Sequence, residues 1–356
     1  MPKSKSMMHA GPVTLKMIAE YLGLSPATIS VVINNSPVAK SIPPVTRQRV
    51  LAAAKKFNYR PNFSARSLRV KRTYTMGIIA PEHSEGYFTN VMMGIETTLV
   101  QAGYLYFTVS HLGRKDLLDE YPRLLMARNV DGFILINTEL QNPVEVPAVA
   151  ISGHVRVPGV TNFVFDHDRA ARMILQHLHA LGHKRIALMK GQPNALDSDS
   201  RFAALQRTAA DLGIPIQPEL CIQLVQNSWS PELGYPVVRD LLQRTHDFTA
   251  LICFNDIAAL GALRAIQDAG LRCPHDISVV GFDDISGASY SIPSLTTIRQ
   301  PLQAMGEAAS TLLIDRINKA DEPYPHEVFF DGELIIREST AAPPAQAAKR
   351  KKLAPK

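Results

Sequence analysis

Side chains that suit a polar small molecule stand directly after several short apolar runs of this sequence. Tyr87 and Phe88 follow the first run, an acidic segment that leads into Arg201 follows the fifth, and Asn255 and Asp283 end two later runs. Trp229 is the only tryptophan. Aromatic faces beside a planar guanidinium and carboxylates suit a sugar, whose C–H face stacks while its hydroxyls bond to charged groups. They would also suit a nucleobase.

The pattern around these residues indicates the elements that must position them. Apolar runs predict strands at 76–80, 105–109, 132–136, 148–151, 185–189, 221–225, 251–254 and 277–282, and the amphipathic stretches between them predict helices at 90–101, 117–128, 168–181, 201–212, 232–243 and 256–269. Continuous apolar strands between such helices are typical of parallel sheets covered on both faces. About eight such units favour two sheets over one. Ligands of these sheets bind beyond the carboxyl ends of the strands.

The first 60 residues have a different pattern. Apolar residues at helical spacing predict a helix that Gly23 ends, and Ser25 as N-cap with Pro26 at the first helical position begins a second. A third helix is predicted at about 46–57. Two short helices joined by a tight turn are typical of a helix-turn-helix, whose second helix enters the major groove of DNA.

The charge is divided unevenly along the chain. The net charge is +6, but residues 1–72 hold 13 Lys and Arg against one acidic residue, Glu20. Residues 73–340 hold 20 Lys and Arg against 31 Asp and Glu. A basic head on an acidic body suits a polyanion as the partner of the head. The charge alone, however, is equally consistent with a basic surface that is simply exposed to solvent and binds no polyanion.

The sequence resembles the lactose-repressor (LacI/GalR) family from about residue 12 to 340. The resemblance rests on VTLKMIAEYLGLSPATISVVINN, TRQRVLAAAKKFNYRPN and SARSL in the head, and on the run FNDIAALGALRAIQDAGLRCPHDISVVGFDDISGASYSIPSLTTIRQP in the body. It implies that base edges face Pro26, Ala27 and Val31. Phosphates would meet Thr14, Ser25, Thr28, Ser30 and Asn34. The implied DNA-binding set also includes Leu15, Tyr59, Asn62, Ala65 and Leu68, of which Leu68 would enter the minor groove from a hinge helix that folds on DNA.

Val31 departs from the longer polar or charged residue that many members carry. A valine can touch a thymine methyl group but cannot form a bidentate bond to guanine. The operator sequence therefore cannot be written down from the family pattern.

The resemblance also implies the fold and the effector site. The expected fold class is α/β, with two Rossmann-like subdomains of the periplasmic-binding-protein type preceded by an all-α helix-turn-helix domain. The expected organisation is a disordered tail at 1–11, the DNA-binding domain at 12–60, a hinge at 61–73, a sensor at 74–340 and a disordered basic tail at 341–356. Within the sensor, one subdomain would hold about 74–167 and 297–327, and the other about 168–296 and 328–340. The effector would contact Tyr87, Phe88, Ser152, Arg201, Trp229, Asn255, Asp283 and Leu302.

Ser152 stands at the end of the fourth predicted strand, where many members have an acidic residue that bonds ligand hydroxyls, so this side of the site departs from the family pattern for sugar recognition. For Asp256, an N-cap role is at least as probable as ligand contact.

Other functions have less support in the sequence. His177, His179 and His183 lack acidic or cysteine partners for a metal, and no nucleotide loop or catalytic motif occurs, so we expect no cofactor and no enzyme. The three cysteines are expected to be reduced packing residues. With no secretion signal and no long apolar run, the protein is expected in the cytoplasm rather than in a membrane. A transport-type binding protein that does not act on DNA is the weaker alternative.

The expected function is a transcriptional regulator, most simply a repressor. It would bind a palindromic DNA operator as a homodimer and respond to a sugar-like effector. The sequence does not distinguish inducer from corepressor, or dimer from tetramer.

Overall fold

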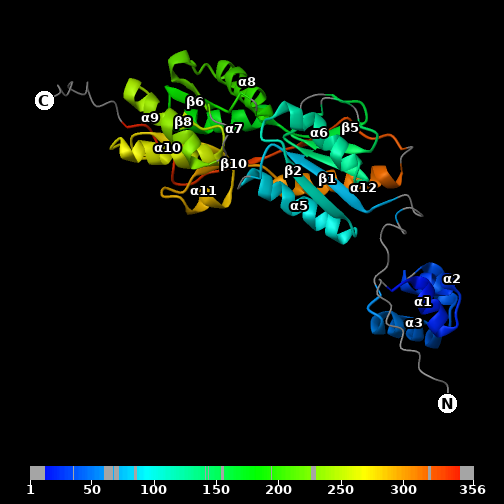
Figure 1. The fold of residues 1–356 in the computed structure, drawn as a ribbon. Coiled ribbons are helices and arrows are strands. Elements are labelled where there is room, and N and C mark those ends of the chain that lie inside the picture. Colours follow the sequence, from blue (N-terminus) through cyan, green and yellow to red (C-terminus); the bar gives the residue numbers. More distant parts are fainter. Residues whose placement is uncertain are drawn as a thin grey trace. The chain divides into compact units, whose positions relative to one another are not determined.

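The computed structural model describes residues 13–34, 36–59, 67, 72–83, 86–140, 142, 144–153, 156–193, 195–225, 230–319 and 322–344. The chain forms two compact units, Met1–Thr73 and Tyr74–Lys356. Figure 1 shows a small helical unit and a larger one in which helices cover sheets. We refer to residues 13–59 as the head and to the second unit as the body.

Local sequence signals set the helices of the head, which are α1 (Leu15–Leu22), α2 (Pro26–Ile33), the 3₁₀ helix η1 (Pro37–Ser41) and α3 (Pro44–Lys56). Thr14 caps α1, and Gly23 ends it with a left-handed backbone at φ 66°. The Ser25 side chain accepts a hydrogen bond from the backbone N–H of Thr28, and Pro26 opens α2. The predicted helix-turn-helix is present, with the third helix beginning two residues earlier than expected.

A small apolar core holds the three helices together. Ile18, Ile29 and Val50, one from each helix, are fully buried. Val13, Leu15, Leu22 and Tyr59 pack against this core at its edge.

The body contains two lobes, each built on a six-stranded sheet. In the first lobe all strands are parallel and follow the order β11-β5-β4-β3-β1-β2. They are β1 (Thr75–Ala80), β2 (Leu105–Ser110), β3 (Gly132–Ile136), β4 (Ala148–Ile151), β5 (Val160–Phe165) and β11 (Glu327–Phe330). Helices α5 (Tyr87–Gln101) and α12 (Leu302–Asn318) pack on one face, and α6 (Lys115–Met126) packs on the other.

The second lobe repeats this plan in the order β12-β10-β9-β8-β6-β7. Its strands are β6 (Ile186–Lys190), β7 (Cys221–Gln223), β8 (Ala250–Ile252), β9 (Ser278–Asp283), β10 (Thr296–Arg299) and β12 (Glu333–Ile335), of which β12 alone is antiparallel. Helices α9 (Gly234–Arg244) and α10 (Asp256–Asp268) cover one face, and α7 (His167–Ala180) and α8 (Leu196–Asp211) cover the other. Three short helices complete this lobe: η2 (Pro218–Leu220), η3 (Pro231–Leu233) and α11 (Ser286–Tyr290).

Glycines allow the helices on one face of each sheet to touch backbone to backbone. A Cβ added at Gly94 of α5 would collide with the carbonyl oxygen of Gln303 in α12, and one at Gly306 would collide with that of Val91. Gly234 and Gly261 bring α9 close to α10 and η3 in the same way. Each lobe is therefore a closely packed block.

The chain passes between the lobes three times, between β5 and α7, between β10 and α12, and between β11 and β12. The three crossings lie against one another at Gly332, where an added Cβ would stand 2.6 Å from the Arg299 carbonyl oxygen and 2.6 Å from the Phe165 ring.

This pairing corrects two expected subdomain boundaries. The boundary at 296/297 falls inside β10, which belongs to the second lobe as far as Arg299, because β10 pairs with β9. The boundary at 327/328 falls inside β11, which belongs to the first lobe as far as Phe330, because β11 pairs with β5.

All eight predicted strands and all six predicted body helices are present, with ends that differ by a few residues. The predictions omitted β5, β10, β11 and β12, as well as α11 and the 17-residue α12. Among the described residues, no single helix has the length and apolar character to span a membrane. Only α1 and α2 taken together pass that test, and the break between them bends by 112°.

Candidate functional sites

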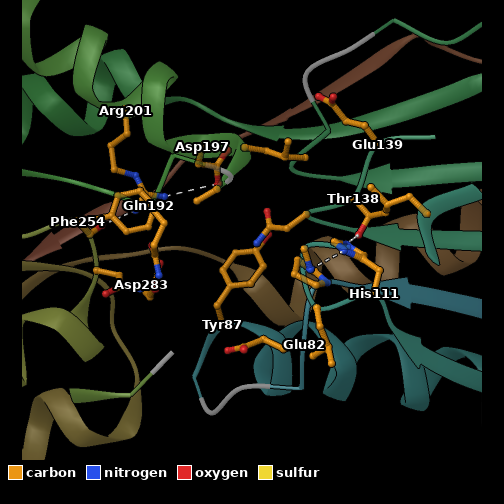
Figure 2. A pocket seen from close by; sticks show the side chains of 18 of the residues that line it. Glu82, Tyr87, His111, Thr138, Glu139, Gln192, Asp197, Arg201, Phe254 and Asp283 are labelled. Atoms are coloured by element: carbon orange, nitrogen blue, oxygen red, sulfur yellow. Dashed lines mark hydrogen bonds and ion pairs between the residues drawn. The ribbon is translucent and has the colours of Figure 1, made fainter. Parts of the chain in front are cut away.

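A cavity of about 230 Å³ lies between the two lobes, at the carboxyl ends of their parallel strands. The first lobe contributes residues that follow β1, β2 and β3, and the second lobe contributes residues that follow β6 and β8 together with the last residue of β9. Figure 2 shows these two walls, with Arg201, Asp197, Phe254 and Asp283 on one side and His111, Thr138 and Glu139 on the other. This is the position at which open α/β sheets bind ligands.

Arg201, on α8, is the buried cation of the second wall. Its guanidinium contacts two phenyl rings, 4.6 Å from the centre of Phe254 and 3.7 Å from that of Phe282. Nη1 donates to the carbonyl oxygen of Phe254 at 2.5 Å, and Nη2 lies 3.6 Å from a carboxylate oxygen of Asp197. The ring contacts, the hydrogen bond and the neighbouring carboxylate together restrict the orientation of the guanidinium.

Asp283 ends β9 beside Arg201 and is 5% exposed. One of its carboxylate oxygens accepts a hydrogen bond from Gln300 Nε2 at 2.6 Å. Burial raises the pKa of Asp283 to about 8, although the positive charge of Arg201 acts in the opposite direction. Near neutral pH this carboxyl is therefore largely protonated, so it can donate a hydrogen bond as well as accept one.

Asn255, rather than Asp256, is the N-cap of α10. Its side-chain oxygen accepts from the backbone N–H of Ala258 at 2.9 Å, which leaves its amide nitrogen available toward the cavity it lines. Asp256 is fully buried and accepts from Thr297 Oγ1 at 2.6 Å and from the Ile285 backbone at 2.9 Å. Burial raises the pKa of Asp256 to about 6. Asp256 therefore joins α10 to β10 and does not line the cavity.

Tyr87 stands between the two walls, as Figure 2 shows. Its hydroxyl forms a 2.8 Å hydrogen bond with Ser152 Oγ. Burial, and next the charge of Asp197, raise the pKa of Tyr87 well above its usual value. Ser152 is 1% exposed, so at this position the serine holds the tyrosine in place.

The first wall depends on the neutral form of His111. Its Nδ1 accepts from the backbone N–H of Gly113 at 3.1 Å, and its Nε2 lies 3.2 Å from Thr138 Oγ1. Thr138 donates its own proton to the Ile136 carbonyl oxygen at 2.8 Å, so His111 must carry its proton on Nε2. Burial lowers the pKa of His111, which favours the same form. Beside this pair, the buried side-chain oxygen of Asn137 accepts no hydrogen bond from the described residues.

The cavity carries more acidic than basic groups. Its described lining includes the carboxyl groups of Glu82, Glu139, Asp197 and Asp283, against Arg201 and the exposed Lys115. Burial also raises the pKa of Glu82. With Asp283 largely protonated and Asp197 beside Arg201, the lining offers no net positive charge to an anionic ligand, whereas hydroxyl and N–H groups would find acceptors.

The structure brings four of the expected effector residues to this cavity: Tyr87, Arg201, Asn255 and Asp283. Phe88 instead packs in the first-lobe core and stacks on His83 at 4.8 Å. Leu302 is 3% exposed and packs in the same core, and Ser152 contacts the cavity only through Tyr87. Trp229 lies outside the described residues.

The residue predictions missed most of the first wall. Glu82, His111, Asn137, Thr138 and Glu139 each follow a predicted strand. The rule that ligands bind beyond the carboxyl ends of strands points to them when it is applied to every strand.

In the head, the residues expected to meet DNA are spread along α1 and α2. Thr14, Ser25, Pro26 and Ala27 are exposed, and Thr28, Ser30, Val31 and Asn34 are partly exposed. Several of the polar ones also support the helices: Ser25 Oγ lies 2.9 Å from Thr28 Oγ1, and the Asn34 amide donates to the Ser30 carbonyl oxygen at 2.8 Å. Leu15 and Tyr59 pack against the head core. Asn62, Ala65 and Leu68 lie outside the described residues.

No group of three or more metal-ligating side chains occurs among the residues that the structure describes. Two of the three neighbouring histidines have structural partners instead. His177 bonds to Thr340, and His183 bonds to Thr249 and to the Ala341 carbonyl oxygen. They attach the segment after β12 to the second lobe.

Two family models match the chain. Residues 14–62 match the bacterial regulatory proteins of the lacI family, and residues 175–340 match a periplasmic binding protein-like domain.

The chain is also similar to characterised proteins over almost its whole length. It is 32% identical to the HTH-type transcriptional repressor PurR of Escherichia fergusonii, over 95% of this chain and 99% of that protein. The lac repressor dimer bound to operator and the anti-inducer ONPF has a TM-score of 0.78 at 28% identity, over 93% of this chain and 100% of that one. The complex of the transcriptional regulator CelR with cellobiose has a TM-score of 0.68 at 27% identity, over 92% and 99%.

Proposed function

Because the chain belongs to the LacI family of bacterial regulatory proteins, we propose that a small molecule in the interlobe cavity controls its affinity for a palindromic DNA operator. The protein is a sequence-specific DNA-binding transcriptional regulator and not an enzyme. The observation that carries the proposal is the cavity, where polar groups from both lobes face one another.

In the DNA complex, we propose that the exposed start of α2 contacts the edges of the bases. Pro26 and Ala27 are exposed there, and Val31 lies one turn further along the helix. Their side chains are apolar or small, so they read methyl groups and shape rather than guanine edges. The hydroxyls of Thr14, Ser25, Thr28 and Ser30, with the Asn34 amide, are assigned to phosphates.

A dimer is supported by apolar side chains that each lobe exposes. Met93, Val100, Leu105 and Phe107 on α5 and the edge strand β2 are between 46% and 70% exposed. In the second lobe, Tyr290 is 86% exposed and Ile292 is 96% exposed. Exposed apolar groups of this size mark interaction sites, and the two-fold symmetry of a dimer matches a palindromic operator. The lac repressor in the operator complex is also a dimer.

For the effector, we propose an uncharged, hydroxyl-rich molecule such as a sugar. The excess of carboxyl groups in the cavity offers acceptors to hydroxyls, and the Arg201 edge and the Asn255 amide offer donors. The bound cellobiose of CelR is a molecule of this kind.

A nucleobase is the second candidate, for one specific reason. The largely protonated Asp283 and the fixed edge of Arg201 present a donor, an acceptor and further N–H groups side by side. This combination also matches the edge of a base.

Control of DNA binding would follow from the shape of the body. The cavity is lined by both lobes, so an effector that fits one interlobe angle better than another shifts the population between them. A difference of ~1–3 kcal/mol in binding free energy between the two states is enough for useful switching.

The DNA part of the proposal is tested by selecting binding fragments from a random duplex library with the full-length protein. The expected result is a palindromic consensus whose affinity falls steeply with salt concentration. Recovery of no consensus would reject this part.

The effector part is tested by thermal unfolding with sugars and nucleobases, because a ligand of the folded state raises the melting temperature. A ligand of the cavity is expected to stabilise the wild type and Arg207→Ala, whose arginine is exposed on the same helix, but not Arg201→Ala. Equal stabilisation of both variants would place the ligand elsewhere.

A further inference from the structure

The 3₁₀ helix η1 follows the recognition helix α2 directly. The backbone N–H of Ser36 donates to the Val31 carbonyl oxygen at 3.1 Å, which joins the turn to the end of α2. Ala39 within the turn is 4% exposed. Ile42, which follows the turn, packs against the head core. The Ser41 hydroxyl donates to the Val38 carbonyl oxygen at 2.7 Å.

Prolines make this turn stiff. Pro37 opens η1, Pro43 is the N-cap of α3, and Pro44 opens α3. Each proline fixes its own φ angle, so little conformational entropy remains to be lost when the turn meets a partner.

The turn presents two side chains that the head does not use for its own packing. Val38 is 62% exposed, and Lys40 is exposed. Within the described residues, Lys40 makes no hydrogen bond or ion pair. The one acidic residue of the first 72, Glu20, lies on α1.

We propose that η1 is a second DNA-contacting element of the head, in which the Lys40 ammonium meets a backbone phosphate of the operator beside the groove that α2 enters. The proposal rests on the proposed function, because it needs α2 to be the helix in the groove. A recognition helix contacts bases through its N-terminal part. Its C-terminal end, to which η1 is attached, is then close to the sugar–phosphate backbone that borders the groove.

Lys56 provides a matched control within the same head. Its ammonium donates to the Tyr21 hydroxyl at 2.9 Å and lies 4.9 Å from the centre of the Tyr21 ring, so it already has partners on the protein. Replacing either lysine by alanine removes one positive charge from the same domain. A general effect of net charge on DNA affinity would therefore be equal in the two variants. The loss of a phosphate contact would weaken binding only in Lys40→Ala.

The experiment measures the affinity of the full-length wild type, Lys40→Ala, Lys40→Arg and Lys56→Ala for a duplex selected by the wild type, over a series of salt concentrations. Each phosphate contact that is lost lowers the slope of log affinity against log salt by roughly 0.9. Because the dimer loses one such contact from each of its two heads, we expect a reduction of roughly 1.8 in Lys40→Ala alone, together with unchanged base preference. Lys40→Arg keeps the charge and should retain the slope of the wild type.

The outcomes separate the inference from the proposed function. Equal slopes for Lys40→Ala and Lys56→Ala, in a wild type that binds DNA selectively, would overturn the role of η1 and leave the regulator intact. Failure of the wild type to select any sequence would reject the proposed operator binding and this inference with it. A changed consensus in Lys40→Ala would also overturn the inference, because a phosphate contact carries no base information.

Discussion

Asp283 and Asp284 are neighbours in sequence, but their carboxylates have different partners. Asp283 lines the interlobe cavity and accepts from Gln300, whereas Asp284 receives hydrogen bonds from Arg299 and Arg337, both at 2.6 Å. Both residues have positive φ angles, 115° and 57°. One short segment therefore joins the interlobe cavity to Arg299, at the end of β10, and to Arg337, after β12.

Replacement of Asp284 by Asn should destabilise the body. The side chain is 7% exposed, and the variant loses the charge that holds two guanidinium groups, while asparagine still accepts the left-handed backbone. We expect a loss of ~2 kcal/mol in the free energy of unfolding, measured by urea denaturation. Asp116→Asn, which breaks an exposed pair with Arg114, is the control and should leave stability unchanged. Equal effects of the two changes would contradict the role of Asp284.

Replacement of Asp283 by Asn should change how stability depends on pH. Folding raises the pKa of this carboxyl from 3.8 to about 8, so the folded state holds an extra proton between these values. The stability that the wild type owes to this group is present at low pH and is lost as the pH rises toward 8. The variant should therefore become more stable relative to the wild type as the pH increases.

Thermal unfolding between pH 5 and pH 9 tests this, with Asp199→Asn, whose carboxylate is 84% exposed, as the control. Parallel curves for the wild type and Asp283→Asn would show that Asp283 does not titrate in this range.

Replacement of Gly306 by Ala should destabilise the first lobe, although alanine is the better helix former. Helix propensity favours the change by about 1 kcal/mol. The added methyl group would collide with the Val91 carbonyl oxygen, which cannot move without shifting α5, and such overpacking costs typically ~1–3 kcal/mol or more. We expect a lower melting temperature, whereas Gln101→Ala at the exposed end of α5 should have little effect. A more stable Gly306→Ala would show that the two helices separate at low cost.

Ser25 has two assigned roles, which two substitutions separate. Ser25→Ala removes the N-cap of α2 and should cost about 1 kcal/mol of helix stability. Ser25→Asp keeps a good cap but adds a negative charge where a phosphate is proposed. Hydrogen exchange of the α2 amides in the full-length protein should show faster exchange only in Ser25→Ala, while operator affinity should fall in both. Normal affinity of Ser25→Asp would remove Ser25 from the DNA contacts.

The head could be predicted from the sequence because its signals are local. Thr14, Gly23, Ser25 and Pro26 act within one or two helical turns of where they stand. The body could be predicted only where a strand or helix carries a clear pattern. In α12, Gly306, Ala309 and Ser310 are among the residues that face other elements, so small side chains replace the large apolar ones that mark a buried face. The subdomain boundaries near β10 and β11 depend on which strand each of them pairs with. β10 pairs with β9, and β11 pairs with β5, which lies far away in the sequence.

The cavity could be predicted in part for a similar reason. Arg201, Asn255 and Asp283 follow or end recognisable elements and match a family pattern. The tautomer of His111 and the bond between Tyr87 and Ser152 depend on contacts across the fold. The exposure of Val38 and Lys40 likewise depends on how η1 packs against the head, and no sequence motif predicts that packing.

At Gly332 the three interlobe crossings meet with no space for even one methyl group. Because the three segments touch at this pivot, a change in the angle between the lobes must move all three together. Substitutions at this pivot would then change the response to every effector in the same proportion, whatever the chemistry of the molecule in the cavity.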